Sequence, residues 1–269
     1  FPYTTLFRSG LSHRDFDTLF TTETSIDALK QTLLQLAVMG KLVPQDPNDE
    51  PASELLKRIQ AEKARLVESG GLKKDKPLRS ISKDEIRDDL PTGWQAARLG
   101  EVVNFTTGKL DSNASVEGGK YPFFTCSKQP SQIDHFAFDC EAILLAGNNA
   151  AGRYDVKHYK GKFNAYQRTY VISTEFGKCS CLTYKFLKVL LSNMLDELQS
   201  SSLGTLTRFL TLGILKPIII ELPPISEQER IVSKVEDLME LCDQLKSRLT
   251  DANQLQQRLA DVFVEQAVA

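Results

Sequence analysis

The chain has 269 residues, of which 41% are hydrophobic and 25% are charged, and its formal net charge is -2. These values are typical of an ordinary soluble protein with enough material for more than one folded unit. They argue against a protein that coats nucleic acid with its whole surface, because the positive charge is local. Residues 90–224 carry three more bases than acids, whereas residues 225–269 carry four more acids than bases.

The five cysteines and three histidines lack the paired spacing of a zinc site. Their arrangement favours a reduced cytoplasmic compartment over a disulfide framework. No apolar run is long enough to cross a bilayer, and no signal-peptide pattern opens the chain. We therefore expect a cytoplasmic protein with no metal site and no membrane partner.

Residues 1–24 are predicted to be a leader. The first ten, FPYTTLFRSG, resemble a translated cloning adapter, which favours a non-native origin, so they are set aside from fold reasoning. Residues 25–72 are predicted to be a helical segment with two helices, one ending at Gly40 and one running from Pro51 to Gly70. Residues 73–89 are charged and lack apolar periodicity, which indicates a linker.

Residues 90–224 change to short apolar runs separated by Gly, Asn and Pro. Strands are predicted at 98–105, 121–125 and 217–222, with further strands in a central stretch at 141–173. One helix is predicted at 183–200. This mixture indicates an α+β domain.

The central stretch, Glu141–Ser173, begins and ends with apolar runs, and between them cations alternate with aromatic side chains and amides. Cations suit phosphates, and amides and guanidinium groups suit base edges. A solvated hairpin whose tyrosines pack on a sheet edge explains the same pattern, and this stretch alone leaves both interpretations open. For the turn at 200–208, ordinary loop chemistry is favoured over phosphate binding. The candidate DNA-binding residues are Lys128, Asn148, Asn149, Arg153, Tyr154, Lys157, Lys160, Lys162, Asn164, Tyr166, Gln167, Arg168, Thr205, Thr207 and Arg208.

Residues 225–269 are predicted to form one long helix. Its apolar side chains recur at alternating steps of four and three, which is the spacing of a coiled-coil seam. A helix of about 40 residues would be roughly 60 Å long, too long to bury this stripe against one small domain, so we expect a partner helix. The candidate interface residues are Ile231, Val235, Leu238, Cys242, Leu245, Leu249, Ala252 and Leu259.

No catalytic signature is evident. The sequence has no Gly-rich phosphate loop, no amino-methyltransferase motif and no recognisable nuclease core. We therefore assign no catalytic residue and expect the lone chain to bind neither S-adenosylmethionine nor ATP.

Three segments carry a resemblance to a known family. They are the helical lead-in QLAVMGKLVPQ at 35–45 with its continuation to Ile59, LPTGW at 90–94 followed by Leu99-Gly100-Glu101, and LPPISEQ at 222–228 with Ile231-Val232 and Leu241-Cys242-Asp243. Together they resemble the specificity subunits of type I restriction-modification systems.

The resemblance implies an α+β target recognition domain at 90–224, flanked by conserved-region helices of which the last is a coiled-coil spacer. It implies a non-catalytic subunit that reads one half of a bipartite site in double-stranded DNA. Methylation and restriction subunits would then methylate adenine or cut DNA, using S-adenosylmethionine, ATP and magnesium. This sequence shows one recognition domain where the full pattern has two. We therefore expect a fragment, or a half-subunit that pairs through the long helix with a second half or a second copy.

Two other classes remain open at this point. One is a coiled-coil adaptor whose α+β domain binds protein, which a salt-dependent DNA shift would distinguish. The other is a divergent stand-alone nuclease or methyltransferase, which activity of the purified chain would reveal.

Overall fold

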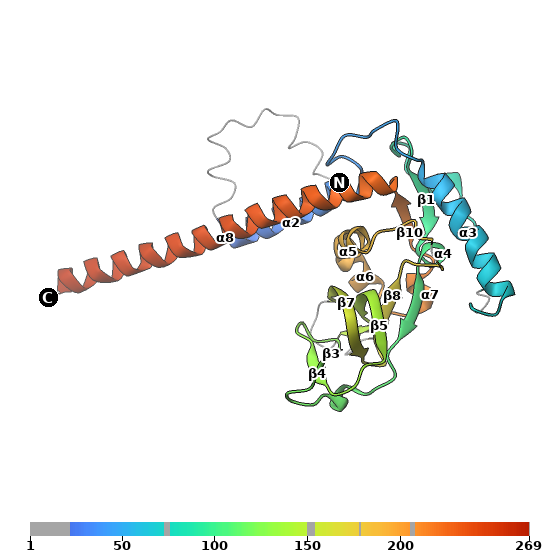
Figure 1. Cartoon of the computed structure of the whole chain (residues 1–269). Helices are drawn as coiled ribbons and strands as arrows, with labels where there is room; N and C mark the ends of the chain where they lie inside the picture. The colour runs from blue at the N-terminus through green and yellow to red at the C-terminus, as the bar shows by residue number, and fades with distance from the viewer. Residues whose placement is uncertain (1–21, 73–75, 150–153, 178, 205–207, 269) are drawn as a thin grey trace. The chain divides into compact units, whose positions relative to one another are not determined.

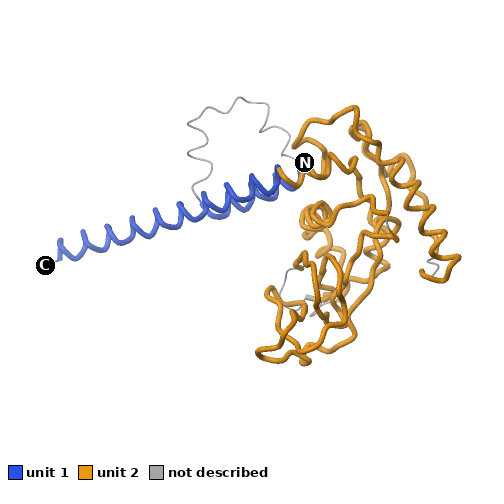
Figure 2. The backbone as a smooth tube through the Cα atoms, viewed as in Figure 1, with its two compact units in different colours: residues 1–35, 234–269 blue, residues 36–233 orange. Residues whose placement is uncertain are grey.

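The computed structural model describes residues 22–72, 76–149, 154–177, 179–204 and 208–268. The chain divides into two compact units, residues 1–35 with 234–269 and residues 36–233, coloured separately in Figure 2. These units do not follow the boundaries expected from the sequence. The second helix, the expected linker and the strands all belong to the second unit.

In the first unit, α2 (Glu23–Val38) lies antiparallel to α8 (Ile225–Val268), as Figure 1 shows. Successive residues of α2 meet successively earlier residues of α8. Thr250 donates to Glu23 at 3.1 Å, Lys246 pairs with Asp27 at 2.9 Å, and Lys30 pairs with Asp243. Exposed ion pairs contribute about 0–1 kcal/mol each, so they set the register of the two helices more than their stability.

The long helix expected from the sequence is confirmed, but part of its stripe faces a helix of the same chain. We had expected the partner helix to come from a missing half or a second copy. Among the predicted interface residues, Ile231, Val235 and Cys242 are buried and Leu238 and Leu249 are half-buried. The predicted interface residues Leu245, Ala252 and Leu259 are exposed.

The second unit contains α3 (Ala52–Glu68), which confirms the helix expected from Pro51 to Gly70 with slightly shorter bounds. The segment expected to be a linker contains a 3-10 turn, η2 (Lys83–Glu85), and is bonded to the strands that follow. Arg87 pairs with Glu221 at 2.6 Å, and the side chain of Arg98 donates to Glu85 at 3.2 Å and to the carbonyl oxygen of Arg79 at 2.7 Å.

A six-stranded mixed sheet forms the body of the second unit. Of its five neighbouring strand pairs, four are antiparallel and one, β3 with β7, is parallel. In spatial order the strands are β2 (Asn104–Thr107), β8 (Thr169–Ser173), β5 (Phe138–Ala146), β7 (Val156–Ala165), β3 (Tyr121–Phe124) and β4 (Ser131–Ile133).

Both faces of the sheet's central strand, β5, are buried. Ala142 and Leu144 belong to a cluster with Phe124, Phe163 and Val171. Ile143 and Leu145 point to the opposite face, because side chains alternate along a strand, and they are also buried. The helix α5 (Tyr184–Asn193) packs against β5 and β7. Burial on both faces explains why this strand reads as an uninterrupted apolar run.

Two expected elements are divided in the structure. The strand predicted at 98–105 is wrong: the chain forms β1 (Gln95–Arg98), one helical turn α4 (Leu99–Val102) and then β2. The carboxylate of Glu101 accepts from the amide of Arg98 at 3.0 Å, which stabilises this turn. The helix predicted at 183–200 is interrupted at Met194, where α5 ends and α6 (Leu195–Ser201) begins.

Smaller elements complete the unit. They are η3 (Ser112–Ala114), β6 (Asn148–Asn149), β9 (Arg208–Phe209), α7 (Leu212–Leu215) and β10 (Ile219–Leu222). The strand β1 pairs with β10, and β6 pairs with β9, in two separate antiparallel pairs. Across the described residues, no helix combines the length and apolarity needed to cross a membrane.

Candidate nucleic-acid interface

Five segments that are distant in sequence are joined by hydrogen bonds into what we call the loop cluster. Its described members are residues 108–111, 126–130, 147–149, 166–168, and 203–204 with 208–210. The turn at 166–168 is its centre: Gln167 N donates to Leu110 O at 2.8 Å, and Gly147 N donates to Arg168 O at 2.7 Å. Leu210 N in turn donates to Gly147 O at 2.8 Å. Backbone bonds therefore hold four of the five segments together, and the fifth, 126–130, makes contact through Cys126 Sγ and the Arg168 carbonyl oxygen.

The turn at 166–168 presents two of the predicted residues to solvent. Gln167 and Arg168 are exposed, and the Gln167 side chain donates to Asp111. The carbonyl oxygen of Arg168 accepts the bond from Gly147 and also lies 3.8 Å from Cys126 Sγ. Because its backbone is held from two sides, the Arg168 guanidinium projects from a fixed base.

Close backbone approach explains the glycine at position 147. A Cβ atom there would lie 2.4 Å from the carbonyl oxygen of Arg168. Gly108 is more restricted still, since its Cβ would lie 1.8 Å from the carbonyl oxygen of Ala165. Both glycines allow the segments of the loop cluster to approach one another.

Further cations lie in or beside the loop cluster. Lys128 and Arg208 are exposed, and Arg208 donates to the carbonyl oxygen of Gln199 at 3.0 Å. Lys157 donates to the carbonyl oxygen of Ser127 at 2.9 Å and pairs with Asp155 at 2.6 Å. The charge of Lys157 is thus partly neutralised, whereas Lys128 and Arg208 have no ion pair with another described residue.

Two predicted cations lie elsewhere on β7. Lys160 and Lys162 pair in register with Glu141 and Asp139, at the start of β5, whereas the loop cluster follows the end of that strand. Lys160 forms an ion pair of 3.0 Å with Glu141, and the Lys162 ammonium lies 4.7 Å from the centre of the Phe136 ring. Both are exposed, and they lie on β7 outside the segments of the loop cluster.

Two of the candidate DNA-binding residues are buried, so their side chains are not free to contact DNA. Asn164 is 2% exposed; its amide nitrogen donates to His135 O at 3.3 Å and its oxygen accepts from Ala165 N at 2.9 Å. Both the nitrogen and the oxygen of the side-chain amide are therefore hydrogen-bonded within the protein. Tyr154 is 3% exposed, and burial raises the pKa of its hydroxyl.

Tyr166 is half-buried beside the turn, and its backbone amide bonds to Phe124 O at 2.9 Å. Asn148 is half-buried and pairs with Phe209 through β6 and β9. The predicted residues Arg153, Thr205 and Thr207 lie outside the described residues, as does the side chain of Asn149.

Sequence reasoning missed three exposed residues of the loop cluster, Lys109, Leu203 and Phe209. Lys109 adjoins Leu110, which forms a parallel bridge with Tyr166. The sequence signal for Lys109 is a cation directly after a glycine, Gly108. This signal is too common in sequences to identify a binding residue. An exposed Leu or Phe cannot be told from a core residue without the fold.

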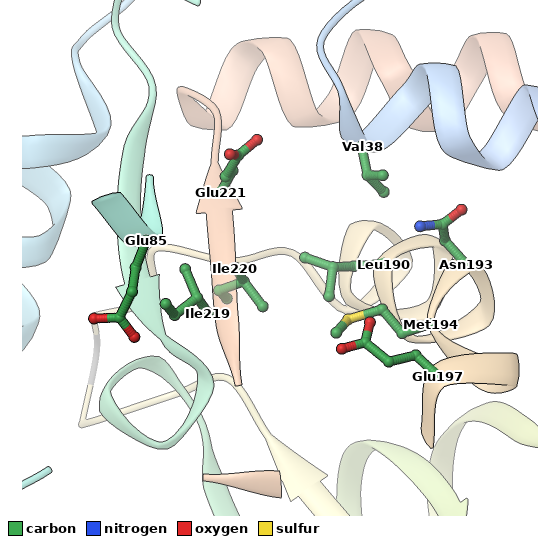
Figure 3. Close-up of a pocket in the computed structure, with 9 residues that line it drawn as sticks. All are labelled: Val38, Glu85, Leu190, Asn193, Met194, Glu197, Ile219, Ile220 and Glu221. Carbon is green, nitrogen blue, oxygen red and sulfur yellow. The ribbon is translucent and has the colours of Figure 1, made fainter. Parts of the chain in front are cut away.

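A pocket of about 280 Å³ lies outside the loop cluster and has a different character (Figure 3). One wall comes from α5 and α6 and carries Met194 and Glu197, and the other comes from β10 and carries Glu221. Burial raises the pKa of Glu221, although Arg87 opposes this effect. The carboxylates of Glu85 and Glu197 repel phosphate, and the apolar side chains of the lining offer it no hydrogen bond, so this pocket does not extend the candidate interface. The described residues contain no group of three or more His, Cys, Asp or Glu placed to hold a metal ion.

Comparison with known proteins identifies the family. Residues 91–255 match the model described as "Type I restriction modification DNA specificity domain". The EcoAI specificity subunit of Escherichia coli is 38% identical over 287 residues, covering 94% of this chain and 46% of that protein. The EcoEI specificity subunit of Escherichia coli is 36% identical over 294 residues, covering 94% of this chain and 47% of that protein. The chain thus spans about half the length of each subunit.

A solved chain from a study of complex assembly and conformational transition of the type I R-M system has the same fold. It is 18% identical, with a TM-score of 0.54, and the match covers 91% of this chain and 57% of that one. The family model covers more than half of the present chain, and its match includes the strands, the loop cluster and the first part of α8. The chain therefore belongs to the family of type I restriction-modification DNA specificity subunits.

Proposed function

We propose that this chain is the DNA-reading part of a type I restriction-modification complex and that its loop cluster contacts one half of a bipartite site. The observation that carries the proposal is the position of two exposed cations, Arg168 and Arg208, on segments that backbone bonds join through Gly147. A third exposed cation, Lys128, lies on a segment that contacts the Arg168 carbonyl oxygen through Cys126 Sγ. Exposed cations on a rigid base neutralise phosphates and release counterions, which supplies sequence-independent affinity. Gln167 and Asn148 add amides of the kind that bind base edges.

In this proposal the chain performs no catalysis. Methylation subunits using S-adenosylmethionine and restriction subunits using ATP and magnesium would assemble with it and act at the site that it selects, methylating adenine or cutting the DNA. Such a complex works in the cytoplasm, where its DNA is. The chain itself would bind no cofactor.

The distal part of α8 supports a second element of the proposal, pairing with another long helix. Beyond Thr250, which contacts Glu23 of α2, the side chains of Leu255, Leu259 and Phe263 are 59%, 51% and 69% exposed. They continue the stripe that α2 meets closer to the start of α8. An apolar stripe along about 18 residues, roughly 27 Å of helix, favours association. The second helix would come from a second half of the subunit or a second copy of this chain.

The test is DNA binding by the chain assembled with methylation subunits, measured by fluorescence anisotropy over a series of salt concentrations. Arg168→Ala should weaken binding and reduce the slope of log K against log salt by about 0.9, the value for one lost phosphate contact. Lys188→Ala is the matched control, because Lys188 is an exposed cation on α5 outside the loop cluster. An Arg168→Ala slope identical to that of wild type and Lys188→Ala would contradict the proposal.

A further inference from the structure

Three residues of the loop cluster form a row across neighbouring strands. Asn148 of β6 is the cross-strand partner of Phe209 of β9, and Phe209 also pairs with Leu203 through two hydrogen bonds of 2.8 and 3.0 Å. Direct cross-strand partners project from the same face of a sheet. Asn148, Phe209 and Leu203 therefore share one face, with Phe209 in the middle.

The opposite face carries the charge. Arg208 precedes Phe209 on β9, and successive side chains on a strand point to opposite faces. Its guanidinium bonds to the carbonyl oxygen of Gln199. One face thus presents an amide and two apolar groups, and the other presents a cation.

The two apolar residues of the row are exposed. Leu203 is 51% exposed and Phe209 is 37% exposed, while Leu210, the next residue, is 4% exposed. The backbone beneath the row is fixed, because Leu210 N bonds to Gly147 O and Leu210 O accepts from the Tyr170 hydroxyl at 3.0 Å. A rigid base that displays apolar side chains to solvent is typical of a contact surface.

The dimensions and chemistry of the row match one feature of DNA. The strands β6 and β9 form a two-stranded ribbon, with Leu203 bridged to β9 at its edge. A two-stranded ribbon fits a major groove about 12 Å wide and not a minor groove about 6 Å wide. In the major groove, an A·T pair presents adenine N6 and N7, which suit the amide of Asn or Gln, and the thymine methyl, which suits apolar side chains.

We propose that the row of Asn148, Phe209 and Leu203 reads A·T base pairs in the major groove of the half-site, while Arg208 on the opposite face contacts phosphate. This inference rests on the proposed function, since it requires that the loop cluster bind DNA. It goes further by separating Arg208, which contacts the DNA backbone, from the row, which determines sequence preference.

The experiment begins with the assembled complex and a randomised duplex library, from which bound DNA is sequenced. The preferred site is then synthesised with uracil in place of each thymine in turn, which removes only the methyl group. For wild type, uracil at a contacted position should weaken binding about fourfold, the value for one buried methyl. For Leu203→Ser and Phe209→Ala the same replacement should have little effect.

Asn148→Ala should reduce the preference for A·T at the contacted pair by about 5- to 140-fold, the range for a bidentate base contact. Arg208→Ala should weaken binding to all sequences alike and leave the preference unchanged. Val116→Ser is the control, since Val116 is 43% exposed outside the loop cluster. Thermal unfolding establishes that each variant is folded.

The outcomes separate this inference from the proposed function. Specific DNA binding by wild type that is insensitive to uracil at every thymine, with Asn148→Ala showing the wild-type preference, overturns the inference and leaves the proposed function standing. Absence of specific binding by wild type overturns both. If the row variants lose a protein subunit while their base preference persists, the row is a protein-docking surface and the inference is wrong.

Discussion

The indole nitrogen of Trp94 donates a hydrogen bond of 3.0 Å to the carboxylate of Glu227, and both side chains are buried. Trp94 directly precedes β1, and Glu227 lies in the first turn of α8. The side chain of Gln45 donates to the same carboxylate at 3.3 Å. This one acceptor therefore joins the start of the strands, the start of the long helix and the connector before α3.

Replacing Glu227 should destabilise the protein in a way that depends on the substitute. Glu227→Ala leaves the Trp94 N–H buried without this acceptor, so the free energy of unfolding should fall by about 1–3 kcal/mol. Glu227→Gln retains an acceptor oxygen and should recover most of the loss at neutral pH. Urea unfolding monitored by tryptophan fluorescence measures both. Equal losses for the two variants would show that the hydrogen bond is not the cause.

The same residue should make stability depend on pH. Burial raises the pKa of Glu227 above its ordinary value of 4.5, an effect that the bonds from Gln45 and Trp94 reduce. The folded state then binds the proton more tightly than the unfolded state. The stability contributed by this group is greatest below pH 4.5 and falls as the pH rises through the raised pKa. The difference in unfolding free energy, wild type minus Glu227→Gln, should decline over that window, and a flat or rising difference contradicts this assignment.

Glu85 should show the opposite dependence. Its carboxylate accepts from the backbone and side chain of Ser82 and from Arg98, which lowers its pKa to about 2. Its stabilising contribution is present above the ordinary value of 4.5 and is lost as the pH falls towards 2. Glu85→Gln should therefore be less stable than wild type at pH 6, with the gap closing at pH 2–3. Urea unfolding at both pH values tests this, and a gap that widens on acidification would refute it.

Gly108→Ala should disrupt the loop cluster. The added Cβ would lie 1.8 Å from the carbonyl oxygen of Ala165, a backbone atom that cannot move without shifting β7. We expect a loss of about 1–3 kcal/mol or more in unfolding free energy, together with weaker DNA binding. Gly213→Ala is the control, because its Cβ meets only Thr211 Oγ1 at 3.5 Å and it lies in α7. If Gly108→Ala behaves like Gly213→Ala, the close approach does not determine the fold of the cluster.

Charge placed at two positions of α8 should have separable effects. Cys242 is buried in the first unit, so Cys242→Glu buries a carboxylate, and its desolvation should destabilise the pairing of α2 with α8 by several kcal/mol. Leu259 is exposed, so Leu259→Glu should leave the isolated chain as stable as wild type while abolishing association with a second long helix. Hydrogen exchange in α2 reports the first effect and light scattering the second. If the chain still associates after Leu259→Glu, the stripe of Leu255, Leu259 and Phe263 is not the interface.

The amino-acid sequence by itself determined the elements whose signals are local. Apolar periodicity and end signals sufficed for α2, α3 and α8, because helix formation and burial of one face depend on residues a few positions apart. The apolar runs at 142–146 and 170–172 likewise predicted β5 and β8. The same reasoning failed at 98–105, where the Glu101 carboxylate accepts a hydrogen bond from the Arg98 backbone amide and favours a helical turn over a continuous strand.

The tertiary structure alone decided which residues meet. Arg168 and Lys162 are close in sequence, yet the former lies in the loop cluster and the latter pairs in register with the start of β5. The sequence predicts Asn164 as a base-reading amide, but in the structure its nitrogen donates to His135 and its oxygen accepts from Ala165. No local pattern marks Phe209 and Leu203, and the strand pairing places them beside Asn148 on an exposed face. Long-range backbone hydrogen bonds decide such groupings, and their partners are separated by tens of residues, so no local pattern encodes them.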